Sequence, residues 1–250
     1  MSEAEQQTGP KASALEARDR GALGAKAAVI QRWLEQEYGP RPWRPHREPL
    51  AELILTILSQ HTSDVNSGRA FEELRRAFPT WEAVRDAPTA AVAAAIRSGG
   101  LAEVKAPRIQ AILRRIEEER GSFDLGFLRQ MPLAEAKDWL RSLPGVGPKT
   151  AACVLLFSLG KPAMPVDTHV LRVASRLGLI GPRVGPEEAE SILESIVPPE
   201  HIYDFHLNLI AHGRRVCKAQ RPRHEVCGLR DWCDFYAREQ SQEARGAVAI

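Results

Sequence analysis

The chain has 250 residues, of which 34 are Lys or Arg and 32 are Asp or Glu, so its formal net charge is only +2 at pH 7. Hydrophobic residues make up 44% of the chain, which is typical of a soluble globular protein with one large domain or two small ones. The small net charge gives no reason by itself to expect a polyanionic partner. No apolar run reaches about 18 residues and the N-terminus has no apolar signal segment, so we expect neither a membrane span nor a secretory leader.

The N-terminal residues 1–24 are rich in Ala, Glu, Gln and Gly and show little apolar periodicity. We therefore expect them to form a mobile tail, and we expect the same of residues 241–250. Apolar spacing begins with a short helix at residues 27–34. The Pro-rich stretch from Gly39 to Pro49 is typical of a linker.

From Leu50 onward, apolar residues recur at helical spacing. The first stripe consists of Leu53, Ile54, Ile57 and Leu58, and a later one of Ile109, Ile112, Leu113 and Ile116. Gly and Pro interrupt these stripes at short intervals, and no stretch alternates in the way a strand requires. The pattern predicts an all-α fold of short helices joined by short loops.

The segment Leu143–Ala151, with the sequence LPGVGPKTA, is the most informative in the chain. Gly145 and Gly147 allow a tight turn, and Pro148 suits the first position of a helix. Lys149 then lies in the first helical turn. Free N–H groups at such a terminus, approached past glycines, suit a phosphate. The ordinary alternative is a helix–turn–helix connection without a ligand.

A carboxylate follows the lysine at a distance: Asp167 lies eighteen positions after Lys149, in the string VDTHVLRV. The amine is a candidate nucleophile, and the carboxylate can stabilise a developing positive charge. Each residue also has a structural explanation. A first-turn lysine is often simply solvated, and an aspartate that precedes a helix is often its N-cap.

The four cysteines fall into two groups. Cys153 lies in an apolar run, where we expect a core residue. Cys217, Cys227 and Cys233 lie within seventeen residues of one another. Without a secretory signal, such spacing indicates metal ligation rather than disulfides. The same segment carries a basic cluster, which is either a solvated face or a nucleic-acid contact: Arg214, Arg215, Lys218, Arg221 and Arg223.

The strings LPGVGPKTA and VDTHVLRV together resemble the endonuclease III family of helix-hairpin-helix DNA glycosylases, and the likeness covers roughly residues 25–236. The resemblance implies a two-lobed all-α fold. Residues 43–161 would form a six-helix barrel that carries the hairpin. Residues 25–42 and 162–240 would form a second helical lobe that carries an iron–sulfur loop.

The resemblance also implies an activity. Lys149 would form a Schiff base with the sugar C1′, and Asp167 would be the second catalytic residue. We expect a bifunctional DNA glycosylase and abasic-site lyase of base excision repair, acting on a damaged base, an oxidised pyrimidine, in double-stranded DNA. We expect a monomer in the cytoplasm, associated with the nucleoid. Two alternatives stay open: a monofunctional mismatch or alkylation glycosylase, and a non-catalytic DNA-binding module.

Further DNA-contacting residues follow from the resemblance. The loop LSQHTSD corresponds to one from which a residue enters the duplex, and either Gln60 or His61 would do so. Leu101 corresponds to a leucine that wedges opposite the vacated base, unless it is a core residue. The hairpin backbone would grip a phosphate at Gly145, Val146 and Gly147. The basic residues of the C-terminal loop would meet other phosphates: Lys218, Arg221 and Arg223.

The metal-binding segment departs from the family at one position. The family spaces four cysteines as Cys-x6-Cys-x2-Cys-x5-Cys, whereas this chain has His224 between Cys217 and Cys227, with Cys233 last. A 4Fe-4S cluster with three Cys ligands and one His is the favoured expectation. The same donors suit tetrahedral zinc. A lost or labile cluster, or no ligation at all, are the remaining alternatives.

Overall fold

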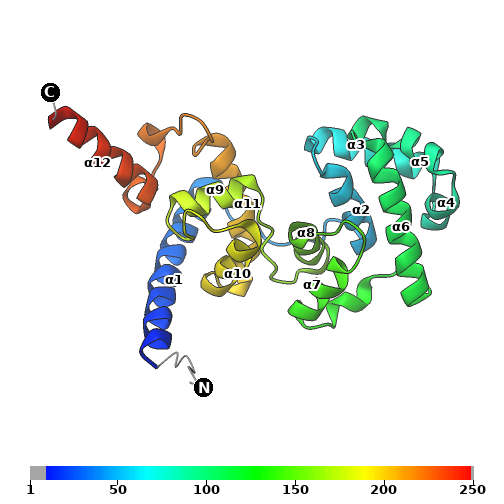
Figure 1. Cartoon of the computed structure of the whole chain (residues 1–250), viewed down its shortest axis with the longest axis horizontal. Coiled ribbons are helices and arrows are strands. Elements are labelled where there is room, and N and C mark those ends of the chain that lie inside the picture. The colour runs from blue at the N-terminus through cyan, green and yellow to red at the C-terminus, as the bar shows by residue number, and fades with distance from the viewer. Residues whose placement is uncertain (1–9, 249–250) are drawn as a thin grey trace, which may run out of the picture. The chain divides into compact units, whose positions relative to one another are not determined.

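The computed structural model describes residues 10–248, and the expectations for residues 1–9 and 249–250 lie outside that range. Within it every regular element is helical and no strand occurs, as the all-α expectation requires (Figure 1). The chain divides into two compact units. Unit 1 comprises residues 1–42 and 166–250, and unit 2 comprises residues 43–165. In the described range no helix is long and apolar enough to cross a membrane.

Unit 2 is built from seven α-helices where the sequence predicted six. The difference arises because α4 and α5, of six and seven residues, are separated by a break at Ala87 and Pro88. Two 3-10 turns, η1 (Arg97–Gly99) and η2 (Gly126–Arg129), complete the unit. The helices are α2 (Pro49–Ser59), α3 (Asp64–Ala77), α4 (Trp81–Asp86), α5 (Thr89–Ala95), α6 (Ala102–Arg120), α7 (Leu133–Arg141) and α8 (Pro148–Leu159).

The core of unit 2 forms where α2 packs against α8 and α3, with α6 packed against α4 and α5. The apolar stripes seen in the sequence supply it: Leu53, Ile57 and Ile112 are fully buried, as is Leu155 of α8. Each such side chain contributes roughly 1.5–3 kcal/mol through burial. The whole buried cluster comes from residues 50–163. Unit 2 therefore has a core of its own.

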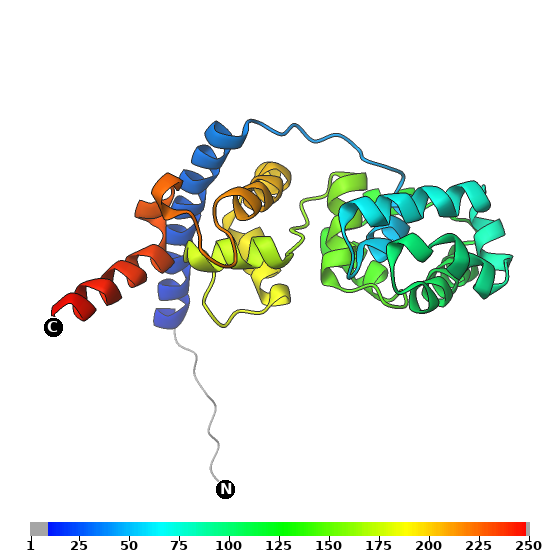
Figure 2. The same cartoon turned by 90° about the horizontal axis from the view of Figure 1, so that it is seen from above.

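Unit 1 brings the N-terminal helix together with the C-terminal part of the chain. Its helix α11 packs against both α1 and α9, and these helices lie side by side in Figures 1 and 2. Phe205 and Leu209 of α11 are fully buried. The helices are α1 (Pro10–Tyr38), α9 (Thr168–Arg176), α10 (Pro186–Ile196), α11 (Ile202–Arg215) and α12 (Asp234–Val248), with 3-10 turns η3 (Pro199–His201), η4 (His224–Val226) and η5 (Arg230–Trp232).

Both expected tails are largely helical, and this corrects the sequence prediction. Helix α1 begins at Pro10, so residues 10–24 are not an irregular tail. Helix α12 continues to Val248. Both segments lack an apolar stripe but are rich in Ala, Glu, Gln and Arg, which are strong helix formers. A segment without apolar periodicity buries little surface, but it can still be helical.

Candidate active site and cluster pocket

The hairpin between α7 and α8 in unit 2 is anchored by two apolar side chains, since Leu143 is 2% exposed and Val146 is 6% exposed. The Val146 amide donates to the Leu143 carbonyl at 3.1 Å, which closes the turn. Gly145 adopts φ +72°, and a Cβ there would lie 2.4 Å from Nε of Arg108. The turn therefore needs glycine both for its backbone conformation and for the close approach of an α6 side chain. Val146 has only its backbone left for a ligand.

The N-terminus of α8 is open to solvent. Its N-cap is Gly147, which provides no side-chain hydrogen bond, and nothing lies within 4 Å of the position of a Cβ there. Pro148 is the first helical residue. The free N–H groups of this 12-residue helix and its dipole form a site for an anion.

Lys149 lies in the first turn of α8, and its side chain is exposed. Its amine makes no hydrogen bond or ion pair with any residue in the described range. An amine without a carboxylate partner is available to a substrate. The lysine thus combines accessibility with a neighbouring anion-binding helix end.

Asp167 is in unit 1 and is the N-cap of α9. The structure thus confirms the structural interpretation of this residue that the sequence allowed. Its Oδ1 accepts a hydrogen bond from the Val170 amide at 2.7 Å, and its backbone carbonyl accepts from the Leu171 amide at 2.9 Å. The other carboxylate oxygen accepts no hydrogen bond from the described residues. One oxygen therefore fixes the side chain and the second is free for a substrate.

Helix α9 is also tied to the C-terminal loop by two arginines. Arg172 donates from Nε to the Cys217 carbonyl at 3.1 Å and from a terminal nitrogen to the Gly213 carbonyl at 3.0 Å. Arg176 donates to the Lys218 and Ala219 carbonyls at 2.6 and 2.9 Å. These bonds to main-chain oxygens link the helix that carries Asp167 to the cysteine segment.

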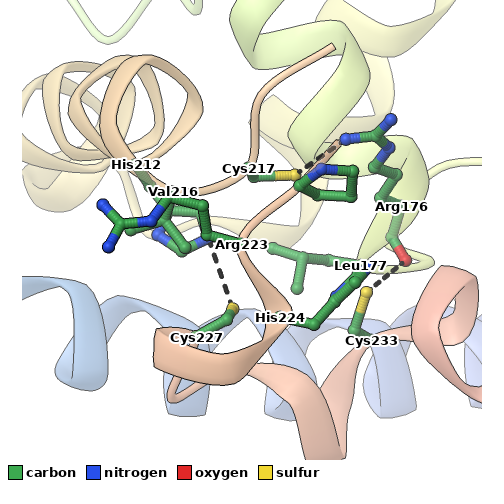
Figure 3. A pocket seen from close by; sticks show the side chains of 10 residues that line it. Arg176, Leu177, His212, Val216, Cys217, Arg223, His224, Cys227 and Cys233 are labelled. Carbon is green, nitrogen blue, oxygen red and sulfur yellow. Dashed lines mark hydrogen bonds between the residues drawn. The ribbon is translucent and has the colours of Figure 1, made fainter. Parts of the chain in front are cut away.

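The three C-terminal cysteines and His224 line one pocket of unit 1, shown in Figure 3. The Cys217 sulfur lies 3.4 Å from a terminal nitrogen of Arg176, and the Cys233 sulfur lies 3.4 Å from the Arg176 carbonyl oxygen. His224 Nε2 lies 2.8 Å from a carboxylate oxygen of Glu239 in α12. Residues that are separated in the sequence thus supply one set of sulfur and nitrogen donors. Cys153 is buried in unit 2, as expected, and takes no part.

A second histidine lies against this donor set. His212 of α11 is 1% exposed, and its Nε2 lies 3.7 Å from the Cys227 sulfur. Its Nδ1 lies 3.0 Å from the Tyr38 hydroxyl. Burial lowers the pKa of His212 to about 4, and burial together with Glu37 raises the pKa of Tyr38 to about 12. Both groups are therefore neutral near pH 7, and each can hold its neighbour in place by a hydrogen bond.

The two loop residues that the sequence left as alternatives differ in the structure. The Gln60 amide is held, because its Oε1 accepts from Arg108 at 3.0 Å and its Nε2 lies 3.4 Å from the Thr150 hydroxyl. His61 is exposed, with φ +56° and no side-chain hydrogen bond to the described residues. Leu101 is 53% exposed with φ +52°, so the interpretation of Leu101 as a core residue was wrong.

Comparison with known proteins identifies the family. The sequence matches the HhH-GPD superfamily of base excision DNA repair proteins over residues 54–199. It matches the iron–sulfur binding domain of endonuclease III over residues 217–233. It is 36% identical to endonuclease III of Thermotoga maritima over 214 residues, which cover 85% of this chain and 96% of the relative. The chain belongs to the endonuclease III family.

Other relatives agree with this assignment. A protein of Arabidopsis thaliana named "Putative DNA glycosylase" is 40% identical over 162 residues, and the chain spans only 55% of its length. Among solved structures, a trapped covalent intermediate of endonuclease III with DNA matches with a TM-score of 0.73 and 28% identity, covering 87% of this chain and 98% of that one. The protein is therefore a DNA glycosylase of the base excision repair type, and the predicted two-lobed fold is confirmed.

The match of residues 217–233 to the iron–sulfur binding domain of endonuclease III confirms the predicted 4Fe-4S cofactor. The donors that line the pocket fit that group. In the part of the chain that the structure describes, no three His, Cys, Asp or Glu side chains converge on a single ion. Tetrahedral zinc needs its four donors about 2.0–2.3 Å from one point. A cluster instead takes one donor at each of several iron atoms, so donors spread around a pocket suit it better.

Two residues that the sequence analysis did not single out contact the loops that are candidates for DNA binding in this protein. Lys105 of α6 is 2% exposed, and Arg108 contacts both Gln60 and the hairpin glycine. The burial of Lys105 could have been predicted from the sequence, because Lys105 lies four residues before Ile109 and so falls on the apolar stripe of α6. No sequence pattern signals the contacts of Arg108, because they depend on how three separate segments meet.

Proposed function

We propose that this protein is a bifunctional glycosylase and abasic-site lyase that removes a damaged base from double-stranded DNA and then cleaves the strand by β-elimination. The observation that carries the proposal is the exposed, unpartnered amine of Lys149 beside an uncapped helix N-terminus. The helix end binds a backbone phosphate of the DNA. The phosphate contact brings a sugar within reach of the amine.

The chemistry follows from the residues at the two helix ends. As the bond between C1′ and the base breaks, positive charge develops on the sugar, as in glycoside hydrolysis. The base leaves with the electron pair of that bond and takes up a proton. The nitrogen lone pair of Lys149 forms a bond to C1′, and loss of the nitrogen's protons and opening of the sugar ring give an imine. The imine makes the C2′ proton acidic, and its removal expels the 3′ phosphate.

Asp167 supplies the negative charge that these reaction steps require. Its free carboxylate oxygen stabilises the cationic sugar, while its other oxygen stays bonded to the Val170 amide. A carboxylate fixed in this way does not reorganise during the reaction. The capping and the catalytic interpretation of Asp167 are therefore compatible.

DNA engagement relies on exposed residues of both units. A base must leave the stack before its sugar can react, at a cost of a few kcal/mol. His61 is better placed to fill the gap than Gln60, because Gln60 is already bonded to Arg108, and Leu101 acts as the opposing wedge. The basic side chains of the C-terminal loop are exposed, and we assign them to DNA phosphates: Lys218, Arg221 and Arg223.

The cluster ligands that we assign are three cysteines and one histidine: Cys217, His224, Cys227 and Cys233. The cluster supplies structure to the basic loop rather than redox chemistry to the reaction. We further propose that the substrate base is an oxidised pyrimidine and that the protein acts as a monomer.

Borohydride trapping on abasic duplex DNA tests the proposal. We expect the wild-type protein to be trapped covalently and both Lys149→Gln and Lys149→Arg to give no trapped product. The arginine variant keeps the positive charge for DNA binding but has no amine that can form an imine. Lys137→Gln, which changes a lysine of α7 outside the glycine turn and the N-terminus of α8, is the control.

Two outcomes would contradict the proposal. Trapping of Lys149→Arg at the wild-type level would remove Lys149 from the covalent step. No strand cleavage by the wild type on an abasic site would leave only base removal or DNA binding. The base specificity is tested separately on duplexes that contain thymine glycol, a uracil mismatch or an alkylated base.

A further inference from the structure

A charged side chain lies in the core of unit 2. Lys105, near the start of α6, is 2% exposed and is among the largest fully buried side chains. Burial lowers the pKa of this amine, since desolvation and nearby Arg108 both disfavour its charged form. Burying an amine is costly unless it is hydrogen-bonded. The hydrogen-bond partners of the Lys105 amine therefore indicate its role.

The Lys105 amine joins two segments that are far apart in the sequence. Its Nζ donates to the carbonyl of Leu58 at 2.6 Å and to the carbonyl of Gly99 at 2.9 Å. Leu58 lies three residues before His61, and Gly99 lies two residues before Leu101. One buried cation thus connects the roots of the two loops that we expect to enter the DNA.

Both loops hold a strained residue beyond the point where the lysine binds. His61 and Leu101 have φ of +56° and +52°, and Arg221 is the only other non-glycine residue in the described range with positive φ. Such a conformation costs a side-chain-bearing residue roughly 1–2 kcal/mol. It persists only where the surrounding structure fixes the backbone on either side. The bonds from Lys105 fix that backbone in both loops.

We propose that Lys105 is a positioning residue that holds the His61 loop and the Leu101 loop in register so that both can enter the duplex together. The proposal rests on the proposed function, since it assigns these loops to DNA. The same face of α6 supports it, because Arg108, one turn later, contacts Gln60 and the hairpin at Gly145. Helix α6 thereby serves as the frame for three DNA-facing segments.

Unit 2 contains a matched control for this lysine. The amine of Lys161 also donates to two carbonyls, those of Met131 at 2.6 Å and Arg129 at 3.2 Å. Arg129 is the last residue of η2 and Met131 follows it closely, so both carbonyls lie outside the His61 and Leu101 loops. Lys161→Met therefore removes the same kind of bond without touching the loop roots.

The test compares Lys105→Met with Lys161→Met in two measurements on the full-length protein. In amide hydrogen exchange of the free protein, we expect Lys105→Met to accelerate exchange at residues 59–63 and 98–101 together. We expect Lys161→Met to accelerate exchange only near residues 129–131. If the methionine variant of Lys105 does not fold, Lys105→Gln, which keeps an N–H donor on a shorter chain, replaces it in both measurements.

The second measurement is cleavage of an abasic site, placed either in a duplex or in a single strand. Only the duplex requires gap filling and a wedge. We expect Lys105→Met to lower the single-turnover rate on the duplex by roughly tenfold or more, because small displacements of positioning groups cost that much. We expect its rate on the single strand to stay near the wild-type value, and Lys161→Met to change neither.

Unchanged exchange in either loop, or equal losses on duplex and single strand, would overturn the proposal. Failure of the proposed function looks different, because the wild type would then cleave neither substrate. In that case the ratio of affinities for a tetrahydrofuran-containing duplex and an intact duplex decides the matter. A ratio in Lys105→Met equal to that of the wild type would refute the role of Lys105, and a lower ratio would support it.

Discussion

At the residue scale, substitution can separate the N-cap role of Asp167 from the catalytic role that we propose for it. Asparagine caps a helix about as well as aspartate but carries no charge. We therefore expect Asp167→Asn to leave the free energy of unfolding nearly unchanged while it lowers the rate of base removal on the order of 10²-fold. Asp167→Ala should lose the same activity and also about 1 kcal/mol of stability, because the bond to the Val170 amide is gone.

Urea unfolding and single-turnover base excision check this pair of variants. A normal excision rate in Asp167→Asn would show that the carboxylate is only a cap. Equal stability losses in both variants would show that the charge itself holds α9.

A second residue-scale prediction concerns Glu52 of α2, which is 6% exposed and whose Oε2 has no hydrogen-bond partner. Burial raises the pKa of this carboxyl above 4.5, and Arg47 offsets the effect only in part. Ionisation of this group therefore costs no stability well below pH 4.5, where the carboxyl is protonated in both the folded and the unfolded state. Its cost grows as the pH rises from 4.5 through the folded pKa, because the buried group must then ionise.

We expect Glu52→Gln to raise the melting temperature at pH 7 and to change it much less at pH 4. Thermal unfolding followed by circular dichroism at the two pH values measures this difference. Glu82→Gln, at an exposed position of α4, is the control. A stabilisation of the same size at both pH values would rule out ionisation of Glu52 as its cause.

At the scale of the element, the hairpin uses its two glycines for different purposes. Gly145 needs its positive φ and its contact with Arg108, whereas Gly147 has φ −94° and open space around it. We expect Gly145→Ala to destabilise the protein by about 1–2 kcal/mol through backbone strain. We expect Gly147→Ser to stabilise it by about 0.5 kcal/mol, because serine is a better N-cap.

The same serine should weaken DNA binding, since its hydroxyl occupies amides that would otherwise bind a phosphate. Urea unfolding and fluorescence anisotropy with labelled duplex DNA measure the two effects on one set of samples. Stronger DNA binding by Gly147→Ser would argue against a phosphate at this helix end. No stability loss in Gly145→Ala would show that Arg108 relaxes freely.

At the scale of the whole molecule, the two units should respond separately to loss of the cluster. The core of unit 2 comes entirely from its own residues, and the cluster pocket comes entirely from unit 1. We expect the purified protein to contain about four iron atoms. Oxidation with ferricyanide followed by chelation should lower the thermal transition of unit 1 and leave that of unit 2 in place.

Calorimetry and metal analysis check this prediction, with hydrogen exchange to assign each transition to its unit. Zinc in place of iron would contradict the assignment of an iron–sulfur cluster to these ligands. An equal shift of both transitions would show that the two units unfold as one. We also expect α9 to lose protection with the cluster, because Arg172 and Arg176 bind the loop that carries its ligands.

The sequence by itself determined the helical class and the buried stripes, and it supplied the candidate residues for the chemistry. Buried apolar residues recur at helical spacing, and a lysine beside a glycine turn involves only neighbouring residues. Both patterns can therefore be recognised in the sequence alone. The helical tails were mispredicted because a helix that buries little leaves no stripe. The sequence could not choose between Gln60 and His61, because the choice depends on Arg108, which lies 48 positions from Gln60.

Only the tertiary structure decided how these residues are supported. The role that we propose for Lys105 depends on the fold, which brings the carbonyls of Leu58 and Gly99 within hydrogen-bond distance of one buried amine. The donors for the cluster likewise come from separate positions in the chain that meet at one pocket. Contacts of this kind join distant segments, and the sequence of either segment alone does not contain them.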